Sequence, residues 1–325
     1  MKYKFFTLYC LISMTFVCVS TACVWAQAPD TPKIAFSAYL EENRDIYLMN
    51  PDGSNQINIT QHKALDGWPA WSPTGDQIIF SSDRGGVRDL YLMDADGSNV
   101  RKVFAKRADR TQATWSPDGQ QIAYRRREPG GSFIYIATID GKTEEKVAFG
   151  SSPDWSPDGE AIAFLTGWPE LMQITVLNVN TRKQRVFFPK PVKPSWMTSP
   201  AWSPSGDKIA FSWLHQVPLV DFADAETIYI INRDGTGLQQ VIKEDARATS
   251  PVWSPQEDML LYNHYIRGTQ PQIYKIELNG GVPAKRLTNP KFWHSVGDWF
   301  DPAFALSVTS QVHLLTTVWS RVKQK

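Results

Sequence analysis

The chain has 325 residues, and its 34 basic and 33 acidic side chains give a net charge of +1 at pH 7. This near-neutral balance gives no electrostatic support for binding nucleic acid or an anionic membrane surface. The three cysteines, Cys10, Cys18 and Cys23, all lie near the N-terminus, so the rest of the chain has neither a disulfide nor a thiolate site.

Residues 1–26 have the pattern of a secretory signal peptide. Two lysines precede an apolar run from Phe5 to Val19, and a small-residue exit follows that ends at Ala26. The apolar run is shorter than the ~20 residues of a membrane span. We therefore predict cleavage near Ala26, a periplasmic or secreted protein of the bacterial envelope, and a mature chain without a transmembrane segment. Lipidation of Cys23 is an alternative.

A tryptophan motif, Trp-Ser-Pro-x-Gly, organises the rest of the chain. The steps between its tryptophans are 44, 40, 47, 51 and 46 residues, and a period of about 40–50 residues is typical of a propeller or solenoid. The fifth copy has lost the glycine, and the sixth keeps only the tryptophan and a displaced proline. The copies begin at Trp71, Trp115, Trp155, Trp202, Trp253 and Trp299.

Each period predicts four strands. A first strand ends at the tryptophan, and the Ser-Pro-x-Gly turn leads to an apolar second strand such as Ile78–Phe80. A loop of variable length precedes a third strand such as Leu90–Leu92, and an Asp-Gly hairpin leads to a more polar fourth strand. Inner strands that are apolar on both faces fit a sheet buried between neighbouring sheets, so each period makes one antiparallel blade.

The two ends of the repeat region complete each other. Ile34–Phe36 and Ile46–Leu48 are second and third strands without a first strand, and Gly297–Trp299 is a first strand without a second. We therefore predict an all-β, six-bladed β-propeller over residues 27–305, closed by pairing of N- and C-terminal strands in one blade. Residues 306–325 form a separate tail whose apolar residues, at steps of four and three, are typical of a helix. We expect the tail to dock on the propeller or to hold a partner.

The repeats resemble those of the TolB-type propellers, relatives of the WD-repeat fold, over roughly residues 33–305. The motifs that carry the resemblance are Trp115–Gly119, Ile78–Arg84 and Asp89–Gly97. TolB itself has an α/β domain ahead of its propeller, which we do not expect here, so its role in the Tol-Pal system is not implied. The resemblance implies the scaffold, export, and binding of other macromolecules.

An up-and-down blade places alternate hairpins at opposite ends of the propeller, and we expect function at the end with the variable loops. Aromatic rings and arginines dominate interface hot spots, although such rings also plug channel mouths or join blades. The run Arg125–Arg127 is interpreted as a solvated loop. The candidate binding residues are Trp68, Arg110, Trp168, Trp196, Trp213, His215, His264, Arg267, Trp293 and His294.

A metal site is the competing interpretation, because some propeller lyases that cleave pectic oligosaccharides hold a divalent metal with loop histidines. His62, His215, His264 and His294 occupy non-equivalent repeat positions without a paired spacing. We therefore predict no metal, no other cofactor and no catalytic residue. The leading hypothesis is a monomeric, non-enzymatic binding or scaffold module for a protein or, second, a polysaccharide. The alternative is a metal-assisted polysaccharide lyase or hydrolase with its site at the channel mouth.

Overall fold

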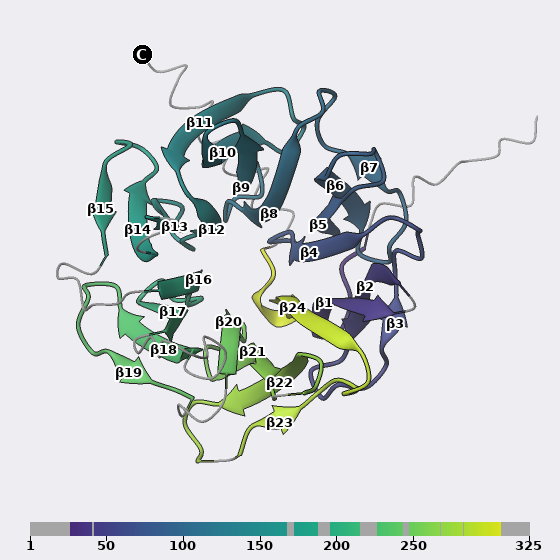
Figure 1. The fold of residues 1–325 in the computed structure, drawn as a ribbon, viewed down its shortest axis with the longest axis vertical. Coiled ribbons are helices and arrows are strands. Elements are labelled where there is room, and N and C mark those ends of the chain that lie inside the picture. The colour runs from purple at the N-terminus through teal and green to yellow at the C-terminus, as the bar shows by residue number, and fades with distance from the viewer. Residues whose placement is uncertain are drawn as a thin grey trace, which may run out of the picture.

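The computed structural model describes residues 27–40, 42–167, 172–187, 196–214, 226–242, 247–266, 268–281 and 283–306. These residues form a closed ring of six four-stranded antiparallel sheets around a central channel (Figure 1). The predicted six-bladed propeller is therefore confirmed. The predicted signal peptide and residues 307–325 of the predicted tail lie outside the described residues.

The strands occupy four concentric positions in the ring. The innermost strands are β4 (Asp66–Trp71), β8 (Asp109–Trp115), β12 (Ser151–Trp155), β16 (Trp196–Trp202), β20 (Arg247–Trp253) and β24 (Trp293–Phe300). The second strands are β5 (Gln77–Ser82), β9 (Gln121–Glu128), β13 (Ala161–Thr166), β17 (Lys208–Leu214), β21 (Met259–Tyr265) and β1 (Lys33–Leu40). The third strands are β6 (Asp89–Asp94), β10 (Gly131–Thr138), β14 (Gln173–Asn178), β18 (Glu226–Asn232), β22 (Gln272–Glu277) and β2 (Asn43–Met49). The outermost strands are β7 (Arg101–Lys102), β11 (Glu144–Phe149), β15 (Gln184–Val186), β19 (Gln239–Gln240), β23 (Lys285–Arg286) and β3 (Ile57–Asn58).

One blade joins the two ends of the repeat region, as predicted. Its strand order is β24-β1-β2-β3, and β24 pairs with β1 from Lys33 opposite Phe300 to Tyr39 opposite Trp293. In Figure 1 the yellow β24 lies beside the purple β1. The closure leaves β1 without an open edge on the channel side.

A turn of the Ser-Pro-x-Gly type leads from the first to the second strand in every blade except the closing one, where the two strands come from opposite ends of the repeat region. In the first turn the Gly75 amide donates to the Ser72 carbonyl at 2.9 Å, and Gly75 has a φ of +74°. The fifth repeat has no glycine, and Glu257 takes this left-handed conformation instead, with a φ of +61°. The turn geometry therefore persists where its sequence signature is lost, at the cost of backbone strain that a glycine would not carry.

The hydrophobic core lies between the blades, because each blade is buried on both faces by its neighbours. Ile79 and Leu92 of one blade pack with Trp115 and Tyr124 of the next. Trp115 and Trp253 add polar links across these gaps, because their indole N–H groups donate to the Ala70 and Ala201 carbonyls at 3.1 and 3.0 Å. Each repeat tryptophan is thus an inter-blade contact.

The propeller has two different ends. The Ser-Pro-x-Gly turns and the Asp-Gly hairpins share one end, here called the turn face, and the second-to-third-strand loops and blade connections share the other, here called the loop face. After β24 the short 3-10 helix η1 (Pro302–Phe304) leads the chain to the turn face, where the Leu306 amide donates to the Pro73 carbonyl at 3.0 Å.

Candidate binding site at the central channel

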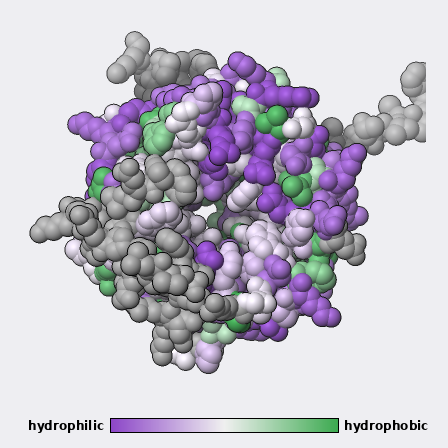
Figure 2. All heavy atoms as spheres, viewed as in Figure 1, coloured by the Kyte–Doolittle hydropathy of each residue, from purple (hydrophilic) through white to green (hydrophobic). Residues whose placement is uncertain are grey.

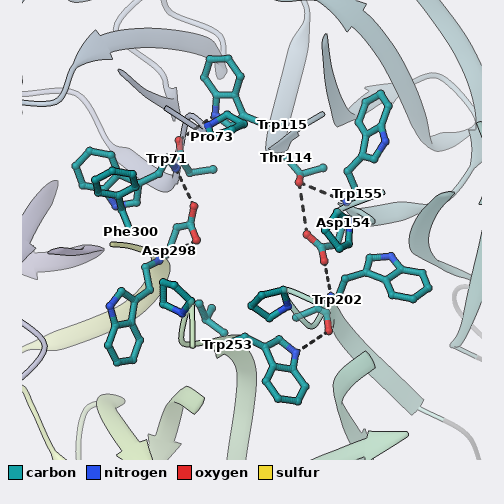
Figure 3. Close-up of a pocket in the computed structure, with 18 of the residues that line it drawn as sticks. Trp71, Pro73, Thr114, Trp115, Asp154, Trp155, Trp202, Trp253, Asp298 and Phe300 are labelled. Carbon is teal, nitrogen blue, oxygen red and sulfur yellow. Dashed lines mark hydrogen bonds between the residues drawn. The ribbon is translucent and has the colours of Figure 1, made fainter. Parts of the chain in front are cut away.

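The innermost strands enclose a channel cavity of about 740 Å³. The prolines and tryptophans of the repeats form most of its wall, and Phe304 and Leu306 line it at the turn face. Figure 3 shows the repeat tryptophans arranged around this cavity. The repeat thus builds a tube whose wall combines apolar rings with small polar side chains such as Ser152, Ser199 and Ser250.

The residue just before each repeat tryptophan lines this channel. In chain order, the residues at this position are Ala70, Thr114, Asp154, Ala201, Val252 and Asp298. The two aspartates are Asp154 on β12 and Asp298 on β24, which belong to opposite blades. Both side chains point into the channel from opposite sides (Figure 3).

Each of these carboxylates joins its own blade to the next one. Asp154 accepts the Trp202 amide at 2.6 Å, and Asp298 accepts the Trp71 amide at 2.8 Å. Thr114 occupies the same position in another blade, and its hydroxyl accepts the Trp155 amide at 3.5 Å. The polar groups in the channel wall therefore connect neighbouring innermost strands.

Both channel carboxylates have unusual acidities. Burial raises the pKa of Asp154 to about 7, and the negative charge of Asp298 adds to this rise. Burial also raises the pKa of Asp298 to about 6. Since solvent reaches these half-buried groups only through the channel, the charged form loses hydration that the protein replaces only in part. The charge of the channel wall therefore changes near neutral pH.

At the loop-face end of the wall, Trp68 stands at the equivalent of Gln112 in the next blade and lines the channel. It has a φ of +53° at a β-bulge between β4 and β5. The guanidinium carbons of Arg44 and Arg88 lie 4.7 and 5.3 Å from its ring centroid. Such cation–π contacts hold the half-buried ring in place at the mouth.

Three of the predicted binding residues are buried. Trp213 packs against Tyr229, with ring centroids 5.0 Å apart, inside an inter-blade core. His294 is buried beside Phe36, and burial lowers its pKa to about 4, so that it is neutral at pH 7. Arg110 is 1% exposed, which places its guanidinium inside the fold.

Arg110 connects two blades through ion pairs. Its guanidinium lies 3.1 Å from Asp89 on β6 and 3.1 Å from Glu144 on β11, and it covers the Phe104 ring at 3.9 Å. The neighbouring run Arg125–Arg127, interpreted from the sequence as a solvated loop, belongs instead to β9. That interpretation was wrong because the β9–β10 hairpin extends the strand to Glu128.

The remaining candidates are dispersed around the loop face. Trp196 begins β16, Trp293 begins β24, and His264 packs on the Tyr274 ring at 4.6 Å in β21; all three are half-buried. They come from separate blades. The other three candidates, Trp168, His215 and Arg267, lie outside the described residues.

Among the described residues, no group of three His, Cys, Asp or Glu side chains is placed to hold a metal ion. His62 accepts the Ala64 amide through Nδ1 at 3.0 Å, which uses one of its two nitrogens. The part of the chain that is described also contains no helix with the length and apolar character needed to cross a membrane.

Sequence reasoning missed the channel aspartates and two of the arginines at the mouth. The aspartates had a readable signal, because Asp154 and Asp298 stand at a repeat position that is otherwise small or apolar. Arg44 and Arg88 had none, since one is in a strand and the other in a loop of a different blade, and only the closed ring brings them to Trp68.

Comparisons with known proteins agree with this architecture. The model of the TolB β-propeller domain matches residues 13–151 and 145–301. A TolB-like protein from Agrobacterium tumefaciens superimposes with a TM-score of 0.63 at 18% identity, covering 83% of this chain and 98% of that one. TolB from Acinetobacter baumannii superimposes with a TM-score of 0.68 at 16% identity, covering 83% and 68%.

An oligogalacturonate lyase in complex with manganese also has this fold, with a TM-score of 0.50 at 17% identity and coverage of 81% of this chain and 74% of that one. No curated protein matches the sequence. At these identities the structural likenesses establish the propeller fold alone.

Proposed function

This chain belongs to the TolB β-propeller family, and we propose that it is a binding module that recognises a partner protein at the loop face, around the mouth of the central channel. It acts by binding, without catalysis. The observation that carries the proposal is Trp68, a large half-buried ring in a left-handed conformation at the mouth. The left-handed conformation belongs to the repeat, because Gln112, Ser152, Ser199 and Ser250 share it at the equivalent positions, and what distinguishes this blade is its large aromatic side chain.

The propeller supports this role through the contrast between its two ends. The turn face repeats one tight turn from blade to blade, whereas the loop face combines connections of different length and chemistry on the same rigid scaffold. Binding residues concentrate on variable loops that a rigid scaffold positions. Trp293 and Trp196 add half-buried rings at the loop-face ends of their strands, and tryptophan is enriched at interface hot spots.

The competing function, a metal-assisted polysaccharide lyase, has no specific observation in its favour among the described histidines. His294 is neutral and buried against Phe36, and His264 packs on an aromatic ring. A polysaccharide remains the second choice of ligand for the loop face. We further propose export to the periplasm or outside the cell after removal of residues 1–26, supported by the order of charged, apolar and small residues there.

The proposed function is tested by capture of envelope proteins on immobilised protein, followed by mass spectrometry, with variants at the two mouths of the channel. Trp68→Asn removes the ring with a residue that tolerates the left-handed conformation. Phe304→Ala is the matched control, because Phe304 is a 55% exposed ring at the opposite mouth.

We expect Trp68→Asn to lower the affinity for a captured partner by about tenfold or more, as loss of a hot-spot ring does. We expect Phe304→Ala to keep the affinity of the parent, and both variants to keep its melting temperature within a few degrees. Capture that survives Trp68→Asn unchanged, or that is lost only in Phe304→Ala, would refute the loop face as the binding surface.

A further inference from the structure

Three arginines from three successive blades converge around the loop-face mouth. Arg44 is on β2, Arg88 is in the loop between β5 and β6, and Arg125 is on β9. Arg44 and Arg88 both lie over the Trp68 ring. Burial lowers the pKa of Arg44, and the charge of Arg88 lowers it further. The pKa of Arg125 is lowered by burial, then by Arg127 and Arg88. Arg88 therefore lies close enough to repel both Arg44 and Arg125.

Three carboxylates lie near this group, Asp66 and Asp83 beside Arg44 and Asp109 beside Arg125. Asp66 is paired with Arg84 at 2.7 Å, and Asp83 accepts the Leu65 amide at 2.9 Å. In the part of the chain that the structure describes, Arg44, Arg88 and Arg125 form no ion pair within 4.0 Å. The three arginines of the mouth therefore lack a direct carboxylate partner among the described residues.

Two guanidinium donors in this cluster are buried without a hydrogen-bond partner among the described residues. They are Nη2 of Arg44 and Nε of Arg88. A buried donor without an acceptor costs free energy, more so for a charged group. Arg110 provides the contrast within the same fold, because its guanidinium reaches Asp89, Glu144 and the Lys106 carbonyl. The fold thus satisfies an arginine that connects blades and leaves donors open at the mouth.

The backbone next to Trp68 is shaped to accept Arg44. Gly67 lies against the guanidinium, and a Cβ at this position would be 3.0 Å from both Cζ and Nε of Arg44. The Nε group donates to the Asp66 carbonyl at 3.0 Å. Arg44 is therefore held in one orientation, in which Nη2 is buried without a hydrogen-bond partner among the described residues.

The arginine cluster also adjoins a second cavity of about 570 Å³. Arg125 and Arg127 line it together with the apolar residues Phe149 and Leu165. Gln112 lines both this cavity and the channel. In Figure 2, hydrophilic residues gather over the blades of β4–β11, beside the narrow opening at the centre of the ring. The charged mouth thus continues into a cavity that has an apolar wall.

From these observations we propose that Arg44, Arg88 and Arg125 form a binding site for a carboxylate of a partner peptide, either an acidic side chain or a C-terminal carboxyl group. This inference rests on the proposed function, because it names the chemistry that the same mouth recognises. Guanidinium groups match carboxylates in planar, bidentate geometry, and a bound carboxylate supplies the direct ion-pair partner that these arginines lack.

A peptide fits this mouth better than an acidic sugar. Two guanidinium groups already lie over the Trp68 ring, so a sugar that stacks on this ring competes with these cation–π contacts. The neighbouring cavity has an apolar wall, which suits an apolar side chain next to the carboxylate in a peptide.

Calorimetry with defined probes tests the site. The probes are a tetraglutamate peptide with both ends blocked, a blocked tetraglutamine peptide, a tetraglycine peptide with a free C-terminus, and trigalacturonate. The variants are Arg88→Gln, Arg125→Gln and Gly67→Ala, which displaces the Arg44 guanidinium and removes no charge. Arg101→Gln is the control, since it removes the same charge from an exposed position on β7.

We expect tetraglutamate or the free C-terminus to bind, and the stronger of the two identifies the source of the carboxylate, while tetraglutamine does not bind. Each of Arg88→Gln, Arg125→Gln and Gly67→Ala should weaken binding about tenfold or more, and Arg101→Gln by less than about twofold. Because Arg88 has no ion pair to lose, Arg88→Gln should melt no lower than the parent. A merely structural arginine would lower the melting temperature on replacement.

Four results overturn the proposal. The first two are that neither carboxylate peptide binds, or that tetraglutamine binds as tightly as tetraglutamate. The other two are that Arg101→Gln weakens binding as much as the variants at the mouth, or that trigalacturonate binds more tightly than the peptides in an arginine-dependent way, which would assign the site to an acidic glycan. The two proposals fail separately. Capture of a partner that depends on Trp68, without binding of the acidic probes, removes the carboxylate site alone. Arginine-dependent probe binding, with capture independent of Trp68, removes the proposed protein-binding face alone.

Discussion

Replacing Asp154 by asparagine should stabilise the propeller at alkaline pH. The side-chain carbonyl oxygen of the introduced asparagine can still accept the Trp202 amide, and its NH₂ group can donate to the Thr114 hydroxyl, so the inter-blade link survives. What the substitution removes is the buried negative charge. Because burial raises the pKa of Asp154 above its unfolded value, the charged form is what the fold tolerates poorly.

The sign follows from proton binding. Between the unfolded pKa of 3.8 and the folded pKa of about 7, the folded state binds more protons than the unfolded state. Stability therefore falls as pH rises through this interval. The full rise corresponds to about 4 kcal/mol at about 1.4 kcal/mol per pH unit. Channel water screens the half-buried carboxylate, so we expect about 1–2 kcal/mol.

Urea and thermal unfolding of the parent and of Asp154→Asn at pH 5 and pH 8.5 measure this effect. The variant should be more stable by about 1–2 kcal/mol at pH 8.5, or about 2–6 °C in melting temperature, with a smaller gain at pH 5, which lies between the unfolded and folded pKa values. Asp140→Asn is the control of opposite sign, because hydrogen bonds and Lys142 lower the pKa of this exposed carboxylate to about 2. A loss of stability in Asp154→Asn that is equal at both pH values would refute the reasoning.

Two further predictions concern inter-blade contacts. Gly75→Ala should destabilise the protein by several kcal/mol more than Gly159→Ala. Both glycines have left-handed φ values, 74° and 76°, so the backbone strain of the two substitutions is alike. A Cβ at Gly75 would clash with the Phe300 ring at 2.0 Å, whereas a Cβ at Gly159 would lie 3.3 Å from a proline. Equal losses in urea unfolding would refute the contact. Arg110→Met should lower the free energy of unfolding by about 2–4 kcal/mol, because Asp89 loses its buried partner and keeps only Lys102 at 3.0 Å. Adding Asp89→Asn should recover part of this loss. An Arg110→Met variant as stable as the parent would contradict the role of the ion pair.

The fold could be predicted because each blade is specified locally. The Trp-Ser-Pro-x-Gly signature and the apolar second strands lie within one period, and the half-blades at the two ends implied the closure that β24 and β1 make. The fifth turn shows the limit of the signature, since Glu257 keeps the geometry without the glycine.

The candidate site was less predictable because burial at the loop face depends on distant neighbours. Arg110 resembles a surface residue until the ring brings Asp89 and Glu144 to it from two other strands. Trp213 did carry a signal, since it follows Ile209 and Phe211 at alternate positions of one strand, and all three face the same inter-blade core. For those residues the strand period was a better guide than the residue type.

The pairing of β24 with β1 also determines the order in which the molecule can be completed during synthesis. The ribosome makes β1 before all other strands and β24 after them, so the main-chain amides and carbonyls of Lys33–Tyr39 wait for partners while about 250 residues are translated. A chain that stops before Trp293 would expose this strand permanently and could recruit a second molecule in place of its own terminus. Any cellular factor that protects the nascent protein has its clearest target there.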